Sequence, residues 1–261
     1  MGAEVQGFMA LRGLDIAKLV FKYPKFHKII DTMNLRAQES GLPDATRVLV
    51  EKAHVNVKTV WDEQFITEAV LKEKPVIVVA NHEFLIEPLI LLSQFPSRKN
   101  LFAVAADFAG DFFGEAVQEL TLPISFKQDL GAVLRNAKSI KRGIKLLYEG
   151  NAIVIFPKPT SKSEKWRSGI GNIIGKVLDR EDIFLIMADI QGVGQNDITK
   201  IFFNTIGVKS KPLNYGLRIS RPILIKDLNM GGLSENSKER ILQITDHLEN
   251  HYKKWVENHN S

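Results

Sequence analysis

The sequence contains no cysteine, and this absence excludes several classes of chemistry. It excludes disulfide bonds, thiolate zinc sites and every mechanism that uses a cysteine nucleophile. The sequence also has no apolar run of the roughly 18 to 20 residues that are needed to span a bilayer. Its start lacks the charged, apolar and small-residue regions of a signal peptide. From these absences we expect a cytoplasmic protein.

The residues that are present indicate an ordinary globular protein. Of the 261 residues, 44% are hydrophobic and 25% are charged, close to the average of folded domains, which argues against disorder and coiled coil. The formal net charge is +5, from 35 Lys and Arg against 30 Asp and Glu. Such an excess favours anionic partners, such as anionic lipid, a phosphate-bearing substrate, an acidic carrier protein or nucleic acid. Solubility alone also explains it.

The first part of the chain, residues 1–70, is predicted to be a helical region. Hydrophobic residues from Phe8 to Met33 recur at three- and four-residue spacings, with lysines between them. Pro24 divides this stretch into two helices. A basic amphipathic helix can pack on a protein core or lie at a membrane surface, and the pattern allows both.

The remainder, residues 71–261, is predicted to be an α/β domain. Short apolar runs alternate with amphipathic stretches, and they occupy residues 76–80, 101–105, 152–156, 183–187 and 216–225. Continuous apolar strands separated by helices indicate a mainly parallel sheet with helices on both faces. One helix is expected over residues 131–148, ended by Gly150, and the last is expected to start at Ser234.

A histidine and a glutamate follow the first of these strands. Asn81 and His82 come directly after it, and Pro88 is suited to begin the next helix, with Glu87 near its N-cap. Within one continuous helix the side chains of His82 and Glu87 would point about 140° apart, but a turn before Pro88 lets them converge.

The carboxyl end of a parallel strand is where open α/β sheets bind ligands. There His82 can take a proton from a hydroxyl while Glu87 holds the other ring nitrogen. The sequence has no Gly-x-Ser-x-Gly elbow, so the simplest chemistry is direct attack by an acceptor hydroxyl. The alternative interpretation is a structural histidine at a helix start and an ordinary capping glutamate.

These residues resemble the first motif of the glycerolipid acyltransferase superfamily, which contains lysophosphatidic acid and glycerol-3-phosphate acyltransferases. That motif is Asn-His followed after four residues by Asp; here Asn81 and His82 match, and Glu87 replaces the aspartate. The resemblance covers residues 70–225. It implies that His82 is the general base and Glu87 its orienting carboxylate.

A second family motif, Phe-Pro-Glu-Gly-Thr-Arg, aligns with residues 156–161. Phe156, Pro157 and Thr160 match, whereas Lys158, Pro159 and Ser161 replace the residues with which the family grips a phosphorylated acceptor. Lysines and an arginine crowd this loop, and Lys127 stands near the position of another phosphate-binding arginine. They either bind a phosphate or form a solvated loop. The expected substrate-binding residues are Asn81, Lys127, Phe156, Pro157, Lys158, Thr160, Lys162 and Arg167.

The resemblance implies transfer of a fatty acyl group from acyl coenzyme A or acyl carrier protein to a hydroxyl of a glycerol phosphate, lysophospholipid or glycolipid. This reaction requires no metal and no cofactor besides the thioester cosubstrate. Family members often work at membrane surfaces, so a peripheral contact with the inner face of the membrane is expected. We find no nucleic-acid-binding module. The alternative function is a noncatalytic lipid- or carrier-binding protein that keeps the fold.

Overall fold

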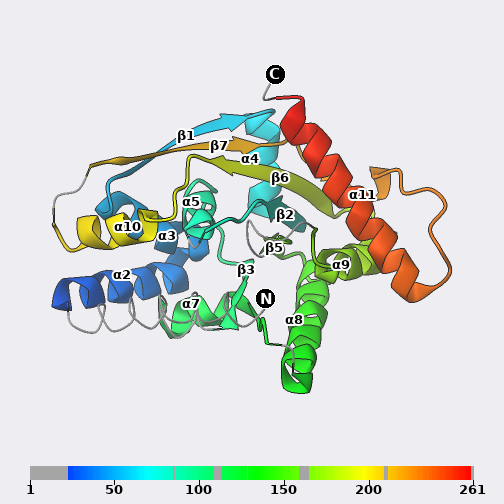
Figure 1. The fold of residues 1–261 in the computed structure, drawn as a ribbon, viewed down its shortest axis with the longest axis horizontal. Coiled ribbons are helices and arrows are strands. Elements are labelled where there is room, and N and C mark those ends of the chain that lie inside the picture. Colours follow the sequence, from blue (N-terminus) through cyan, green and yellow to red (C-terminus); the bar gives the residue numbers. More distant parts are fainter. Residues whose placement is uncertain are drawn as a thin grey trace.

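The computed structural model describes residues 23–84, 86–107, 113–127, 129–158, 165–208 and 211–259. In this part of the chain an eight-stranded, mainly parallel sheet lies between helices on both faces (Figure 1). The predicted α/β class is therefore confirmed. The helix that the sequence predicts before Pro24 lies outside the described residues, and the second one begins at Pro24 as expected.

The strand order of the sheet is β1-β7-β6-β2-β5-β3-β4, with β8 paired to β6. Neighbouring strands run parallel, except that β6 is antiparallel to β7 and to β8. The central strands β2 and β5 are buried along their whole length, which explains their unbroken apolar sequences. The strands are β1 (Val55–Trp61), β2 (Val76–Ala80), β3 (Leu101–Ala106), β4 (Thr121–Ile124), β5 (Ala152–Ile155), β6 (Phe184–Gln191), β7 (Leu213–Ile219) and β8 (Ile223–Leu224).

The strand β1 was not predicted, because residues 1–70 were expected to be helical. It pairs with β7 from Val55–Leu213 to Trp61–Ile219. Its side chains alternate between half-buried and exposed, and it is rich in the β-branched residues that favour a pleated surface. Residue 70 therefore does not separate a helical region from the sheet, which begins with β1.

Alternate side chains of the strands face two hydrophobic layers. One layer contains the side chains of Val76, Val78 and Ala80. The helices that cover it are α2 (Pro24–Ser40), α3 (Leu42–Lys52), α4 (Gln64–Glu73), α5 (Glu87–Ser93), α7 (Glu115–Glu119) and α10 (Asp197–Thr205). The layer of Ile77 and Val79 is covered by α8 (Leu130–Tyr148), α9 (Gly169–Val177) and α11 (Ser237–Glu257). Among the described helices, none is long and apolar enough to cross a membrane.

Two predicted helix ends can be checked against the structure. Gly150 follows α8 with φ of 84°, a left-handed conformation that glycine adopts without strain, so the predicted cap is confirmed. The last helix begins at Ser237, three residues later than expected. Asn236 caps it by accepting hydrogen bonds from the backbone N–H groups of Lys238 (3.0 Å) and Glu239 (3.2 Å).

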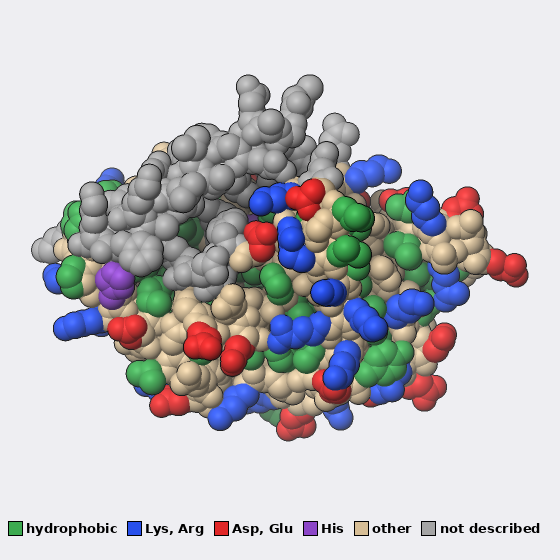
Figure 2. All heavy atoms as spheres, turned by 90° about the horizontal axis from the view of Figure 1, so that it is seen from below, with side chains coloured by type: hydrophobic (Ala, Val, Ile, Leu, Met, Phe, Trp, Pro, Cys, Tyr) green, Lys and Arg blue, Asp and Glu red, His purple; other side chains and the backbone are tan. Residues whose placement is uncertain are grey.

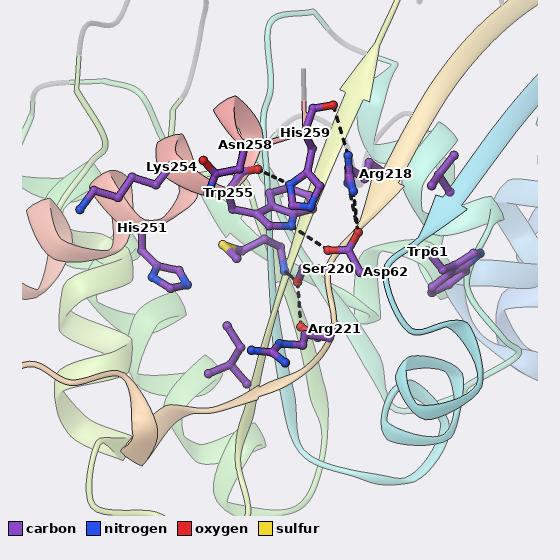
Figure 3. A pocket seen from close by; sticks show the side chains of 13 residues that line it. Trp61, Asp62, Arg218, Ser220, Arg221, His251, Lys254, Trp255, Asn258 and His259 are labelled. Carbon is purple, nitrogen blue, oxygen red and sulfur yellow. Dashed lines mark hydrogen bonds and ion pairs between the residues drawn. The ribbon is translucent and has the colours of Figure 1, made fainter. Parts of the chain in front are cut away.

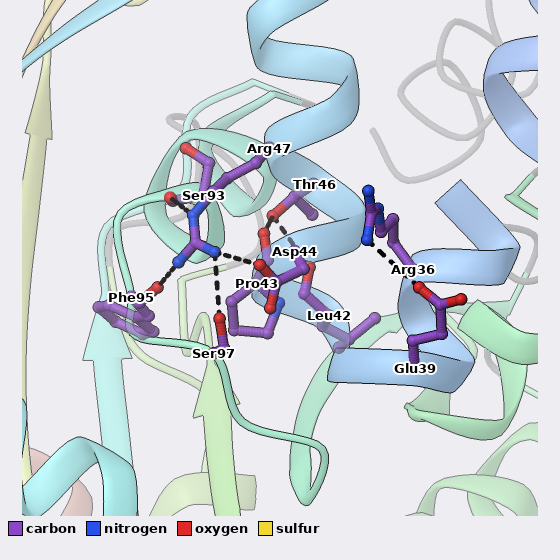
Figure 4. Close-up of polar contacts among 10 residues, drawn as sticks. All are labelled: Arg36, Glu39, Leu42, Pro43, Asp44, Thr46, Arg47, Ser93, Phe95 and Ser97. Carbon is purple, nitrogen blue, oxygen red and sulfur yellow. Dashed lines mark hydrogen bonds and ion pairs between the residues drawn. The ribbon is translucent and has the colours of Figure 1, made fainter. Parts of the chain in front are cut away.

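Arg47 of α3 anchors the end of α5 (Figure 4). Its guanidinium donates to the carbonyl oxygens of Ser93 (2.9 Å) and Phe95, and it pairs with Asp44 in its own helix. Charged donors satisfy carbonyls at a helix end that would otherwise lack partners. Because α5 starts at Glu87, this contact holds the helix that carries the carboxylate of the candidate site.

Candidate active site

The turn between β2 and α5 carries the candidate catalytic pair. The strand ends at Ala80, His82 lies in the turn, and Glu87 is the first residue of α5. Pro88 occupies the second helical position, where its missing N–H leaves no helical hydrogen bond unmade. The helix thus begins one residue earlier than predicted. His82 still lies outside it, so the two side chains are able to converge.

Glu87 closes this turn. One of its carboxylate oxygens, Oε1, accepts hydrogen bonds from the backbone N–H groups of Glu83 (3.1 Å) and Phe84 (2.7 Å). The side chain is only 1% exposed, so these donors compensate an anion that burial would otherwise destabilise. The second oxygen, Oε2, is left available for another group.

That second oxygen faces His82. Oε2 lies 3.3 Å from Nδ1 of the imidazole, which is within ion-pair range. Within the described part of the chain neither atom makes an aligned hydrogen bond, and catalytic hydrogen bonds are often loose before substrate binds. With Nδ1 turned toward a carboxylate, a neutral imidazole carries its proton there and keeps the lone pair on Nε2. The arrangement fixes the orientation of the His82 ring relative to Glu87.

Asn81 fastens the turn to the neighbouring strand β6. Its side-chain Nδ2 donates to the carbonyl oxygen of Ile190, and its Oδ1 accepts from the Ile190 N–H, both at 2.8 Å. These two bonds continue the pairing of β2 with β6 beyond Ala80. The sequence analysis placed Asn81 among the substrate-binding residues; in the structure both polar atoms of its side chain bond to Ile190, and Asn81 does not line the cavity described below.

An apolar cavity of about 430 Å³ opens beside His82. The ring of Phe156 lies next to the imidazole, with 5.3 Å between the ring centroids. The volume is in the range of roughly 300–1,000 Å³ that is typical of small-molecule sites. The His82 side chain is 18% exposed, so it can meet a ligand there. Aliphatic side chains from both hydrophobic layers line the cavity, among them Leu42, Leu89, Leu92, Val117, Ile140 and Ile173.

The cavity lies at a gap between two strands. β3 pairs with β5 only as far as Ala103 and Val154, and then continues to Ala106 beside β4. The carboxyl ends of β3 and β5 therefore separate. Residues 104–106 line the cavity on one side of this gap, and Ile155 and Phe156 line it on the other. The cavity lining therefore includes side chains from both hydrophobic layers.

Part of the second predicted motif lies at the same edge of the sheet. Phe156 and Pro157 line the cavity, and the Pro157 carbonyl accepts a hydrogen bond from the Arg167 N–H (3.0 Å). Arg167 also lines the cavity, with its guanidinium carbon 5.4 Å from the centroid of the Phe126 ring. Three of the predicted substrate-binding residues thus line the same cavity as His82.

Two other predicted substrate-binding residues do not line this cavity. Lys127 is exposed and Lys158 is half-buried, and neither lines the cavity. Thr160 and Lys162 lie outside the described residues. Of the predicted cations that the structure describes, Arg167 alone reaches the cavity.

The likeness of this chain to known proteins is one of structure. No protein-family model and no curated protein matches the sequence. A solved acyltransferase structure is similar. It is the crystal structure of the 1-acyl-sn-glycerophosphate (LPA) acyltransferase PlsC from Thermotoga maritima, with 14% sequence identity, a TM-score of 0.47, and coverage of 96% of this chain and 97% of that chain. Values this low are not evidence of a shared substrate.

Sequence reasoning missed the residues that hold α8 beside the cavity. The Asn136 side chain donates to the Ser125 carbonyl (2.9 Å) and accepts from the Ser125 N–H (2.7 Å). The Ser139 hydroxyl donates to the Pro123 carbonyl (2.6 Å). Phe126, another lining residue, directly follows this segment. The sequence marks none of these partners, because Asn136 and Ser139 are ordinary polar positions in an amphipathic helix.

Helix α11 contacts Trp166, which precedes α9, and strand β6. Glu249 accepts a hydrogen bond from the Trp166 N–H (3.0 Å), and the Trp166 and Tyr252 rings pack at 5.4 Å between centroids. The Tyr252 hydroxyl donates to the Ala188 carbonyl (2.9 Å) and lies 3.3 Å from Oδ1 of Asp189. Burial raises the pKa of Asp189. These contacts connect α11 to β6 just before the point where Asn81 is held.

A second cleft, of about 760 Å³, is lined by β1, β7 and α11 (Figure 3). At its centre Asp62 accepts hydrogen bonds from Arg218 (2.9 Å) and from the indole N–H of Trp255 (2.9 Å). The Arg218 guanidinium also lies over the Trp255 ring, 5.9 Å from its centroid. None of the predicted site residues that the structure describes lines this cleft. We interpret its central polar groups as a structural junction between the sheet and α11.

Proposed function

We propose that this protein is an acyltransferase. It transfers a fatty acyl group from a thioester, either acyl coenzyme A or acyl carrier protein, to a hydroxyl of a glycerol phosphate, lysophospholipid or glycolipid. The observation that carries the proposal is the His82–Glu87 pair beside an apolar cavity. A hydroxyl nucleophile needs an oriented base, and an acyl chain needs an apolar site.

In this proposal Nε2 of His82 removes the proton of the acceptor hydroxyl while the hydroxyl oxygen attacks the thioester carbonyl carbon. Glu87 stabilises the imidazolium that forms. The tetrahedral intermediate then collapses, so that the carbon–sulfur bond breaks and the new carbon–oxygen bond remains as an ester. The imidazolium returns its proton to the departing thiolate. No proton is gained or lost overall, and His82 is again neutral.

In this proposal the apolar cavity holds the acyl chain. Each buried methylene contributes about 0.8 kcal/mol to binding. The small side chains Ala105 and Ala106 on its wall leave space where β3 and β5 separate. The thioester then lies at the His82 end, with the chain directed between the two hydrophobic layers.

Arg167 is the cation that we assign to an acceptor phosphate. It lines the cavity, and its position over the Phe126 ring orients a planar group with several N–H donors. An arginine of this kind binds phosphate through charge-assisted hydrogen bonds. Lys127, Lys158, Thr160 and Lys162 stay predictions from the sequence for this role.

The test is a transfer assay with the full-length chain. Long-chain acyl coenzyme A and acyl carrier protein serve as donors, and glycerol 3-phosphate, lysophosphatidate and a glycolipid serve as acceptors. Thiol release gives the rate, and mass spectrometry identifies the ester. We expect His82→Ala to lower the rate at least about 100-fold with an unchanged melting temperature. His251→Ala, on α11 in the second cleft, is the matched control and should keep the wild-type rate. Equal turnover by His82→Ala and wild-type protein would end the proposal.

A noncatalytic lipid- or carrier-binding function is the second candidate. Two observations favour it: the substitutions at Lys158, Pro159 and Ser161 in the second motif, and the position of Lys127 and Lys158 outside the cavity lining. This function predicts that the wild-type protein binds a fluorescent fatty acid but forms no ester with any donor and acceptor. The transfer assay together with this binding measurement therefore separates the two candidates.

A further inference from the structure

The amino-terminal end of α8 exposes hydrophobic side chains that no described part of the fold buries. Leu130 is 75% exposed, Val133 is 58% exposed and Leu134 is 56% exposed. Positions spaced by three and four residues share one face of a helix, so these three side chains form one patch, here called the apolar tip. Single exposed hydrophobics are normal on protein surfaces, whereas a contiguous group of large ones indicates an interaction site.

The tip is held firmly although its own side chains are not packed. Asn136 and Ser139 bond the same helix to the backbone at the end of β4, and Asp129 caps its start by accepting from the Ala132 N–H (2.7 Å). α8 projects from the body of the molecule at the lower edge of the view (Figure 1). The exposed side chains of the tip therefore lie on a helix end that hydrogen bonds hold in place.

All charged residues within α8 itself are basic, and Asp129, its N-cap, is the acidic residue directly before it. α8 contains five basic residues and no Asp or Glu; the basic residues are Arg135, Lys138, Lys141, Arg142 and Lys145. Arg142 bonds the carbonyls of Glu119 and Thr121, and Lys145 lies 3.6 Å from Glu149. Within the described residues no ion-pair partner is found for Arg135, Lys138 or Lys141. The same holds for Lys127, which precedes the helix. In the view from below, basic and hydrophobic side chains lie next to one another on the right half of this face (Figure 2).

The tip lies at the same edge of the sheet as the candidate active site. β4 runs parallel to β3, which is parallel to β5, and β5 is parallel to β2, so the carboxyl ends of these strands face one way. His82 follows β2, and α8 begins shortly after β4. Asn136 and Ile140 of α8 also line the cavity beside His82. A surface that contacts the tip therefore lies close to the cavity.

We propose that the amino-terminal end of α8 docks on an anionic lipid bilayer. Leu130, Val133 and Leu134 enter the interfacial region, and Lys127, Arg135, Lys138 and Lys141 contact the lipid phosphates. A bilayer fits both observations, because an interfacial helix requires an apolar face and is strengthened by cations beside anionic lipid. This inference rests on the proposed function only for the substrates, which a bilayer would supply to the cavity.

The experiment measures binding of the full chain to vesicles by sedimentation, with no catalysis involved. Vesicles of phosphatidylcholine mixed with phosphatidylglycerol are compared with vesicles of phosphatidylcholine alone. We expect the wild-type protein to prefer the mixed vesicles, and added salt to weaken that preference. Binding that is absent from both vesicles, or equal on both, overturns the proposal.

Two variants separate the apolar and the charged contributions. The combined variant Leu130→Ser, Val133→Ser, Leu134→Ser should bind the mixed vesicles at least about tenfold more weakly, because each methylene that is no longer buried in the bilayer weakens binding. The combined variant Arg135→Gln, Lys138→Gln, Lys141→Gln should lose roughly fivefold per removed charge, and only on the anionic vesicles. The matched control replaces three hydrophobic residues that are exposed elsewhere on the protein by serine. These residues are Phe65, Ile66 and Leu242. Equal losses in the control and in the tip variant would show that the tip has no special role.

A second readout keeps this inference distinct from the proposed function. With short-chain, monomeric substrates, the serine variant of the tip should transfer acyl groups at the wild-type rate, whereas it should be slower on acceptors embedded in vesicles. If no substrate is turned over by any form, the acyltransferase proposal fails while the sedimentation result still decides the docking proposal. If acidic carrier protein binds the tip and vesicles do not, the docking proposal is wrong.

Discussion

Replacing Glu87 by glutamine separates the chemical role of the carboxylate from its role in the fold. The two side chains have nearly the same shape, and the glutamine oxygen can accept the same two hydrogen bonds from the N–H groups of Glu83 and Phe84. The amide nitrogen then occupies the place of Oε2, 3.3 Å from Nδ1 of His82. Because the amide donates, Nδ1 must accept, and the imidazole proton moves to Nε2. That nitrogen can no longer take a proton from the acceptor.

The size of the effect follows from what is lost and what is kept. General-base catalysis contributes about 10²–10⁴-fold, so kcat should fall by that factor, or about 3–5 kcal/mol in activation free energy. The free energy of unfolding should change by less than about 2 kcal/mol, since both hydrogen bonds to the turn survive without their charge assistance. Glu87→Ala, by contrast, removes the acceptor of two partly buried N–H groups, and hydrogen bonds to a charged group contribute about 1.5–3 kcal/mol each.

The assay measures initial rates of thiol release at saturating donor and acceptor, with urea unfolding of the same preparations. We expect Glu87→Gln to lose kcat while keeping near-normal stability, and Glu87→Ala to lose both. A Glu87→Gln protein whose kcat stays within about threefold of wild type would refute the tautomer argument. Equal loss of stability in both variants would show that the turn itself requires the negative charge.

Two further predictions concern stability and chain length. Burial tends to raise the pKa of Asp197, but hydrogen bonds from Lys200, the Gly194 N–H and Tyr215 outweigh it and lower this pKa. A depressed folded pKa contributes stability above the unfolded pKa, near 3.9, and this stability is lost as the pH falls through the folded pKa. The free energy of unfolding of Asp197→Asn should therefore be about 1–3 kcal/mol lower than that of the wild type at neutral pH. Urea titrations at falling pH should show this difference between variant and wild type disappear. A difference that stays constant with pH would contradict the link between the lowered pKa and stability. Ala105→Leu adds three carbons to the cavity wall. It should weaken the binding of long-chain acyl donors by roughly 2 kcal/mol and leave the binding of short-chain donors unchanged. Competition between donors of different length checks this, and a uniform loss at every length would mean a damaged site.

The parts of the fold that could be predicted are those with a strong local pattern. β2 and β5 are buried on both faces, so their sequences are unbroken apolar runs. β1 escaped prediction because it carries Asn56 and Lys58 on its exposed side and depends on pairing with β7, whose residues lie far along the chain. The pairing of β1 is set by its partner strand β7, so a short stretch of the β1 sequence does not reveal it.

The candidate site divides in the same way. The approach of His82 and Glu87 could be inferred from the sequence, because a strand end, a turn and Pro88 lie within a few residues and restrict the backbone locally. Which cations reach the cavity could not be inferred, since Arg167 lies within it and Lys127 and Lys158 do not. That outcome depends on how α8, α9 and the strand ends pack, as does the gap between β3 and β5 beside the cavity. A cavity is the space left between elements that are distant in the chain, so it exists only once they have packed.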